Sequence, residues 1–499
     1  MGQKIYIHEL PCYKVAAEEM IQKEKISPER CFDLSQLPGE ELQKEVEAFV
    51  LERGRCLSLT SILRELPSFN LICKFISEKE KHLKSFREKS CETLVRRLKA
   101  WLLENGYSLS YERYRKQYAK STRQEVGAVV YLRKLYSFLE PEDERPEYEK
   151  DIWVLENLGI PLRENPIKKI KKLNFSSIPQ HLIREEIKAA IHMEIKHVAI
   201  GTVLAELSAV KRFTKYLRDR EKTIKSCEDI DRNVIEKYLT YLNTEVAGKK
   251  SYRTELIHLK TILGIVGKIK ENRRLEQLFV STDIPGEVQA LYKTYSDDVI
   301  KKFNACIVKM DEQIARALII HQMLGTRISD TLTLTVDCLY MKKQRHMVKI
   351  NSVKGHDYEK AIDEEVAALI QKAIDYTQEQ YGDTKYIFVS GSDIESPYQY
   401  SMIQSRIMGM IREQDLRDDD GKLLGFDTHV FRHTYGRKLT EMHLDDYTIS
   451  KLLGHSNISS VKYYRKLSNG ALAEETKEMR QTMDQILTDL IKEWDDEQL

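Results

Sequence analysis

Two arginines, two histidines and one tyrosine in the C-terminal part of the chain could together act on a phosphodiester. His429 and Arg432 stand three residues apart, Arg327 lies upstream, and His455 precedes Tyr464 by nine residues (464 − 455 = 9). A guanidinium can bind two phosphate oxygens and does not lose its proton. A phenol oxygen can attack phosphorus once a nearby group removes its proton. The set therefore indicates an enzyme that cleaves a phosphodiester.

The boxes around these residues resemble those of the tyrosine recombinases, the phage integrase family. They read Leu324-Gly325-Thr326-Arg327-Ile328-Ser329-Asp330, His429-Val430-Phe431-Arg432-His433 and Leu453-Gly454-His455, followed by Tyr464. That family has a Gly-x-Arg-x-x-Glu/Asp box, a His-x-x-Arg box, a Leu-Gly-His box and a tyrosine nine residues past the last histidine. One box would be weak evidence, whereas four in the family's order are specific. The resemblance covers roughly residues 175–468.

The resemblance implies a catalytic role for each residue of the set. Arg327 and Arg432 would clamp the phosphate, His429 would accept a proton or donate a hydrogen bond, His455 would donate to a non-bridging oxygen, and Tyr464 would be the nucleophile. Fixed cations are the main catalytic device here, because the transition state spreads charge over the equatorial oxygens. Alone, such an arginine would be an ordinary helix-end cation, and a single histidine is usually structural.

A lysine completes the set that the resemblance implies. The family places a general acid on a β-hairpin, where it protonates the departing 5′ oxygen. Lys354 stands at a predicted hairpin turn, although Val353 replaces the family's usual glycine before it. Lys360 is a competing candidate.

Three neighbouring residues have weaker assignments. Asp330 could orient an arginine or a histidine, or it could cap the helix that follows it. His433 is expected to be supporting or structural. Tyr463 occupies a position that is usually apolar in the family, so the resemblance implies a packing residue. One helical step turns a side chain by about 100°, so two adjacent tyrosines cannot both face one phosphate without distortion.

Composition limits the other chemistries. The 80 basic and 78 acidic residues leave a net charge of +2, so any DNA-binding surface must be a local patch. The eight cysteines form no Cys-x-x-Cys pair, and there is no phosphate-binding Gly-rich loop. We expect no metal and no other cofactor, because the arginines take the place of a divalent cation. With no signal peptide and no membrane-spanning run, we expect a soluble cytoplasmic protein, nucleoid-associated if prokaryotic.

Hydrophobic periodicity and proline-rich breaks predict a mainly α fold with a small β-hairpin sheet in a mixed α/β catalytic domain. The resemblance implies that the second helical domain is the family's core-binding (SAM-like) DNA-binding bundle. The predicted segments are an N-terminal segment (1–31), a helical domain (32–140), a linker (141–174), a core-binding domain (175–275), a linker (276–296), a catalytic domain (297–468) and a C-terminal helix (469–499). The last helix would dock on a neighbouring protomer or pack in cis.

The two helical domains echo each other at a constant offset of 141 residues. Glu45-Val46 matches Glu186-Ile187, and Ile62-Leu63 matches Val203-Leu204 (186 − 45 = 141). We interpret the first domain as a duplicate of the core-binding domain, although two amphipathic bundles could also align by chance. It would serve as an added DNA-binding module or as a protein-interaction domain. Phosphate contacts in the second copy are expected from Lys211, Arg212, Lys215, Lys249, Lys250 and Arg253.

These observations predict a site-specific DNA recombinase of a mobile element that works through a 3′-phosphotyrosyl intermediate. Its partners would be double-stranded DNA, at the element ends and the target site, and three further copies in a homo-tetramer. Sister recombinases or accessory proteins could also be required. The alternatives are a type IB topoisomerase, which shares the chemistry without exchanging partners, and a catalytically silent DNA-binding accessory protein.

Overall fold

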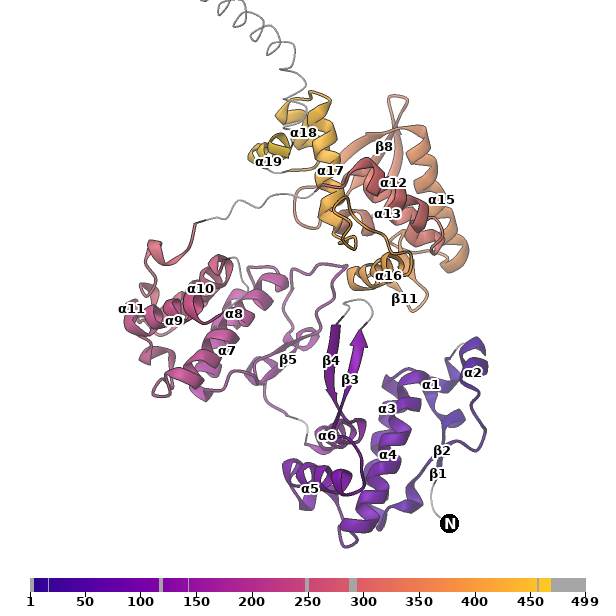
Figure 1. The fold of residues 1–499 in the computed structure, drawn as a ribbon, viewed down its shortest axis with the longest axis vertical. Coiled ribbons are helices and arrows are strands. Elements are labelled where there is room, and N and C mark those ends of the chain that lie inside the picture. Colours follow the sequence, from indigo (N-terminus) through magenta and orange to yellow (C-terminus); the bar gives the residue numbers. More distant parts are fainter. Residues whose placement is uncertain are drawn as a thin grey trace, which may run out of the picture. The chain divides into compact units, whose positions relative to one another are not determined.

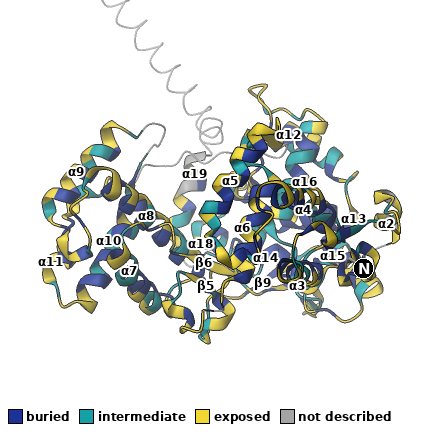
Figure 2. Ribbon diagram, turned by 90° about the horizontal axis from the view of Figure 1, so that it is seen from below, coloured by how far each residue is buried: buried dark blue, intermediate teal, exposed yellow. Residues whose placement is uncertain are grey.

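A computed structural model describes residues 4–16, 18–115, 120–141, 143–246, 251–286, 294–455 and 457–467 (Figure 1). The chain separates into two compact units, Met1–Glu144 and Arg145–Leu499. The described part is mainly helical with small antiparallel sheets, which confirms the predicted fold class. Its longer helices, such as α8 (Ile200–Arg220), bury one face and expose the other (Figure 2). None of the described helices is long and apolar enough to span a membrane.

The first unit is a helical bundle with one core. The N-terminal segment, to which the sequence assigned no role, belongs to this core through Ile5, Ile7 and Leu10. Its first strand pairs antiparallel with a strand 27 residues further along, at Lys4↔Asp33 and Tyr6↔Cys31 (31 − 4 = 27). The elements are β1 (Lys4–Tyr6), α1 (Pro11–Lys14), α2 (Glu18–Glu24), β2 (Cys31–Asp33), α3 (Glu40–Cys56), α4 (Leu59–Lys79), α5 (Cys91–Glu104), β3 (Ser110–Arg115), β4 (Lys120–Glu125) and α6 (Gly127–Leu139).

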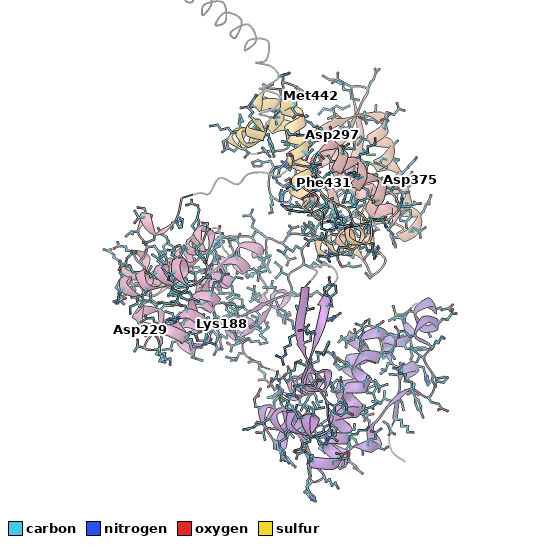
Figure 3. All side chains as sticks on the ribbon, in the orientation of Figure 1. Lys188, Asp229, Asp297, Asp375, Phe431 and Met442 are labelled. Carbon is cyan, nitrogen blue, oxygen red and sulfur yellow. The ribbon has the colours of Figure 1, made fainter. Side chains whose placement is uncertain are left out.

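The second unit opens with another helical bundle, which has its own core. Its elements are β5 (Ile152–Val154), β6 (Lys172–Asn174), α7 (His181–Glu194), α8 (Ile200–Arg220), α9 (Arg232–Thr244), α10 (Arg253–Ile269) and α11 (Arg273–Glu276). The bundle extends into the segment 141–174 that was predicted to be a linker. There Trp153 is fully buried against Phe175, and β5 pairs with β6. Lys188, labelled in Figure 3, donates to Glu149 O at 2.6 Å and fixes the same segment to α7.

The two bundles repeat each other in detail. Helices α4 and α8 begin and end 141 residues apart (200 − 59 = 141; 220 − 79 = 141). In the first bundle Glu45 accepts bonds from the Ser85 hydroxyl (2.6 Å) and the Phe86 N–H (2.9 Å). In the second, Glu186 accepts from the Ser226 hydroxyl (2.9 Å) and the Cys227 N–H (2.7 Å). A carboxylate in the same place thus holds the loop before α5 and before α9.

The rest of the second unit packs helices around a three-stranded antiparallel sheet of order β7-β8-β9. Phe431, labelled in Figure 3, lies in its core with ring centroids 5.0 Å from Tyr295 and 5.3 Å from Phe303. The elements are α12 (Asp297–Ile307), α13 (Glu312–Leu324), α14 (Ile328–Leu332), β7 (Leu339–Lys342), β8 (Arg345–Ile350), β9 (Tyr358–Ile362), α15 (Glu364–Tyr381), β10 (Val389–Ser390), β11 (Asp393–Pro397), α16 (Tyr400–Glu413), α17 (Thr428–Glu441), α18 (Asp446–Leu452) and α19 (Lys462–Leu467).

The basic run at 168–172 begins where the chain leaves this domain's surface. Ile167 is buried in the domain core, and Tyr400 N donates to its carbonyl at 2.9 Å. Lys169 Nζ lies 2.6 Å from Asp393 Oδ2 in an ion pair between exposed side chains.

The predicted C-terminal helix (469–499) falls outside the described residues.

Candidate active site

Side chains from α17, α19 and the loops before α14 and after α18 converge on one cleft of about 340 Å³. It is lined by Arg327, His429, Arg432, His433, His455, Ser460 and Tyr464. The structure therefore brings together five of the six residues predicted to be catalytic, although they span 138 positions of the chain (327 to 464). Ser460 is an addition, from the turn before α19, and no sequence signal singled it out. Among the described residues, no group of three His, Cys, Asp or Glu side chains could hold a metal ion.

Arg432 lies at the centre of this arrangement and is only 3% exposed. Its Nη1 donates to Gly325 O at 3.0 Å, and its Nη2 donates to Leu453 O. Gly325 ends α13 with φ +62°, a left-handed conformation that suits glycine. Arg432 thus holds two turns, one leading to Arg327 and one leading to His455. Burial lowers its pKa, yet a guanidinium stays charged, and its five N–H groups exceed the two that the carbonyls use.

Arg327 and Asp330 connect the cleft to the loop between β8 and β9. Arg327 stands at the N-cap of α14, with Nη1 3.5 Å from Asp330 Oδ2. Asp330 is 1% exposed and also accepts from Val353 N (3.1 Å) and from the Ser352 hydroxyl (3.4 Å). Of the two roles considered for Asp330, the geometry is that of orienting the arginine, since the residue lies inside α14 and not at its cap.

The two candidate lysines lie in different environments. Lys354 is exposed in the β8–β9 loop and does not line the cleft. Lys360 is buried on β9, where Nζ donates to Leu324 O (2.5 Å) and to Tyr435 Oη (2.8 Å) and lies 4.4 Å from the Tyr435 ring centroid. Burial, with the Arg432 charge nearby, lowers the pKa of Lys360 to about 7. Lys360 is thereby engaged in holding the end of α13.

The histidines of the cleft are neutral at neutral pH. Burial lowers the pKa of His433 to about 4 and that of His455 to about 3, and neighbouring cations act in the same direction. Burial also lowers the pKa of His429. The His455 and His433 rings each lie 5.9 Å from the Tyr464 ring. A neutral imidazole can accept the phenol proton or donate one N–H to a phosphate oxygen.

Tyr464 is 4% exposed and its ring lies directly over Gly436 of α17. A Cβ at position 436 would come within 2.8 Å of the ring, so only glycine lets the tyrosine sit this close to the helix. This close approach was missed from the sequence, although Gly436 stands inside a predicted helix, four residues after Arg432. The side chain of Tyr463 lies outside the described residues.

The basic residues predicted to contact phosphate have mixed surroundings. Lys211, Arg212 and Lys215 lie on α8, but Arg212 forms an ion pair with the buried Glu255. Arg253, at the start of α10, donates to Pro285 O at 2.7 Å. Lys249 and Lys250 fall outside the described residues. The prediction for this group stays a prediction.

The fold and the cleft are those of a tyrosine recombinase. Residues 286–470 match the model of the phage integrase family, so this part of the chain is similar to that family. Transposase B from transposon Tn554 of Staphylococcus aureus strain Mu50 is 23% identical over 434 residues, which cover 85% of this chain and 68% of that protein. The corresponding transposase of PsiTn554, also from Staphylococcus aureus, has the same identity and coverage.

Some solved structures of recombinases are similar to part of this chain. The XerH site-specific recombinase bound to a palindromic difH substrate is 16% identical, with a TM-score of 0.44, over 60% of this chain and 91% of that one. The Tn1549 transposon integrase in complex with circular intermediate DNA is 15% identical, with a TM-score of 0.40, over 56% of this chain and 94% of that one.

Buried neutral histidines predict that acid destabilises the fold. His321 is 1% exposed; its Nε2 donates to Thr428 O (3.2 Å), its Nδ1 accepts from Thr331 (3.1 Å), and burial lowers its pKa to about 4. The unfolded chain binds a proton near pH 6.5 and the folded chain does not, so stability is full above about 6.5 and decreases as pH falls toward 4. Between roughly pH 7.5 and 5, the free energy of unfolding of His321→Gln should therefore decrease by about 2 kcal/mol less than that of the wild type.

Urea unfolding at the two pH values measures this difference. The glutamine variant is expected to be less stable at neutral pH but less sensitive to acid. An equal loss of stability in the variant and the wild type would show that His321 does not contribute to the acid response.

Proposed function

We propose that this tyrosine recombinase cleaves one DNA strand through Tyr464 and rejoins it to a new partner. His429 would accept the phenol proton while Tyr464 Oη attacks phosphorus, and His455 would donate to a non-bridging oxygen. A 3′-phosphotyrosyl bond forms as the bond to the 5′ oxygen breaks, and Lys354 would protonate that oxygen as it leaves. A 5′-hydroxyl from the partner strand would then attack phosphorus and give its proton to Lys354, while the bond to Tyr464 breaks and the phenol regains its proton from His429. The steps conserve bond energy, so no nucleotide cofactor is required.

The observation that carries this proposal is the convergence of two arginines, three histidines and Tyr464 on one cleft. Arg432 supports it most directly, because two backbone carbonyls fix its orientation before any ligand binds. Preorganised donors stabilise developing charge without reorganising during the reaction. Arg327 adds a second cation that Asp330 holds at 3.5 Å. Together they would neutralise the phosphate oxygens as the bonds change.

The substrate we propose is double-stranded DNA at the ends of a mobile element and at its target. The names of the curated relatives support this choice, since they are transposases of Tn554-type transposons. A single chain carries one nucleophile, and exchange between two duplexes breaks four strands. We therefore propose that four copies act together, with sister recombinases able to replace some of them.

Formation of a covalent adduct tests the proposal. A nicked duplex carrying the element's end would be incubated with wild type, Tyr464→Phe and Tyr463→Phe, because the nick lets the cleaved strand diffuse away and traps the intermediate. We expect a protease-sensitive protein–DNA band, stable in denaturant, with wild type and Tyr463→Phe. The Tyr464→Phe variant should form none, since it lacks the attacking oxygen.

Three results would contradict the proposal. An adduct that persists in Tyr464→Phe would place the nucleophile elsewhere. Binding of DNA by all three proteins without any adduct would indicate a DNA-binding accessory protein. Adduct formation accompanied by relaxation of supercoiled DNA, but never by recombinant product, would favour topoisomerase activity.

A further inference from the structure

The β3–β4 hairpin is an addition to the first of the two matching bundles. Between the bundles the offset is 141 residues through α4 and α8, but it falls to 127 at α6 and α10 (255 − 128 = 127). The first bundle therefore holds 14 additional residues before its last helix (141 − 127 = 14). The buried positions that match at 127 are Ala128, Val129, Leu132, Leu135, Tyr136 and Leu139 with Glu255, Leu256, Leu259, Ile262, Leu263 and Val266.

The described arms of the hairpin form a two-stranded ribbon with two different faces. The register pairs Tyr111 with Gln124 and Arg113 with Thr122, so these four side chains share one face. The other face pairs Glu112 with Arg123, whose Nε donates to the Ser110 hydroxyl at 2.7 Å. The first face thus presents an aromatic, a guanidinium, an amide and a hydroxyl, with no carboxylate.

The ribbon extends away from the helices of its unit, as Figure 1 shows, while Tyr111 and the half-buried Gln124 at its base border a hollow that Glu65 and Lys134 of the bundle also line. Tyr111 and Tyr114 are 53% and 59% exposed, and Arg113 and Arg123 are exposed as well. A two-stranded ribbon without a hydrophobic face is marginally stable in water. Exposed aromatic and basic side chains on such an element indicate a binding surface that a partner covers.

Charge identifies the kind of partner. Residues 110–125 contain five basic and two acidic side chains, a local charge of +3 in a chain whose total is +2. One of the two acids, Glu125, is already neutralised by Lys99 (2.6 Å) and Arg133 (2.9 Å). The ribbon is therefore complementary to a polyanion.

The first bundle also lacks the basic stripe of its counterpart. Lys211, Arg212 and Lys215 of α8 correspond, at the 141-residue offset, to Asn70, Leu71 and Lys74 of α4. Two of the three cations are replaced by uncharged residues. If the first bundle binds DNA, the surface that contacts it must differ from the one on α8, and the ribbon supplies a different cationic surface.

We propose that the β3–β4 ribbon enters the major groove of double-stranded DNA and reads base edges with Arg113 and Gln124. The major groove admits a two-stranded ribbon, arginine pairs with guanine, and glutamine pairs with adenine. The recognised sequence is distinct from the one cleaved at Tyr464. This inference rests on the proposed function for the identity of the ligand, but not on the chemistry of cleavage.

Selection from a pool of duplexes with a randomised centre tests the proposal with the full-length chain. Wild type, Arg113→Ala/Gln124→Ala and Arg123→Ala would each select DNA from the pool, and the enriched sequences would be compared. Arg123→Ala is the matched control, because it removes the same charge from the same ribbon on its other face. We expect wild type and Arg123→Ala to enrich a shared motif that the double variant loses, with affinity for that motif roughly 5- to 150-fold weaker.

The outcomes separate this proposal from the proposed function. Adduct formation on the nicked substrate should remain in the double variant, since the ribbon does not belong to the cleft. Identical enriched motifs in all three proteins would overturn base reading by the ribbon. Unchanged motifs with a loss of self-association, measured by ultracentrifugation without DNA, would assign the ribbon to a protein contact instead. If the nicked substrate yields no adduct, the selection still tests base reading by the ribbon, because it measures DNA binding and not cleavage.

Discussion

Arg432→Lys is expected to slow strand cleavage by about 10³-fold while the protein still binds DNA. The arginine uses one nitrogen for Gly325 O and another for Leu453 O, and it keeps further N–H groups for phosphate. A lysine has a single ammonium and cannot hold both carbonyls and a phosphate oxygen in these positions. Loss of the carbonyl bonds also frees the turns that lead to Arg327 and His455.

Single-turnover adduct formation on the nicked substrate measures this effect. Arg437→Lys is the matched control, because Arg437 lies on the same helix and pairs with Glu441 at 3.5 Å, outside the lining of the cleft. The control should cleave at nearly the wild-type rate. If Arg432→Lys cleaves as fast as Arg437→Lys, then Arg432 serves only the structure. An unfolding temperature of Arg432→Lys close to the wild-type value would exclude misfolding as the cause of its slow cleavage.

The residues of the cleft could be found from the sequence because short boxes carry them in a fixed order. The spacing from His455 to Tyr464 covers one turn and the start of one helix, and the two ring centroids lie 5.9 Å apart. The number of residues between Arg327 and Arg432 did not predict that the two arginines lie in the same cleft. Their meeting depends on a carbonyl bond from α17 to the end of α13, which only the fold supplies.

The burial of Lys360 could be predicted from its position in the strand but not from its residue type. On β9, Tyr358, Lys360 and Ile362 share one face, since side chains alternate along a strand. A lysine is normally assigned to the solvent face, yet here that face is turned inward. The alternation therefore carried the signal, but the burial of the charge depends on Leu324 O and Tyr435, which lie 36 and 75 residues away.

The boundaries at 1–31 and 141–174 were hard to place for a different reason. The strands there are three residues long, too short for an alternating pattern to be recognised. The prolines in the segment 141–174 are also typical of a linker. What the sequence did contain was Trp153, a large aromatic side chain that a solvated linker would seldom expose and that the fold buries completely.

Lys354→Ala is expected to slow cleavage of ordinary DNA by about 10²- to 10⁴-fold. The departing 5′ oxygen needs a proton, and Lys354 lies on the loop that Asp330 fixes beside Arg327 through Val353 N. If the bridging 5′ oxygen is replaced by sulfur, the leaving group is a thiol with a pKa of about 8.5, which departs without an acid. The sulfur substrate should therefore restore cleavage by Lys354→Ala to near the wild-type rate.

Lys360→Met provides the comparison that decides between the two lysines. The pKa of Lys360, about 7, would suit a general acid, but its Nζ is held by Leu324 O and Tyr435 Oη and lies outside the lining of the cleft. Its loss should shift the end of α13 and slow both substrates equally, because displacement of Arg327 affects either leaving group. Rescue by sulfur in Lys360→Met, without rescue in Lys354→Ala, would transfer the acid role to the buried lysine and require the β9 face to open during the reaction.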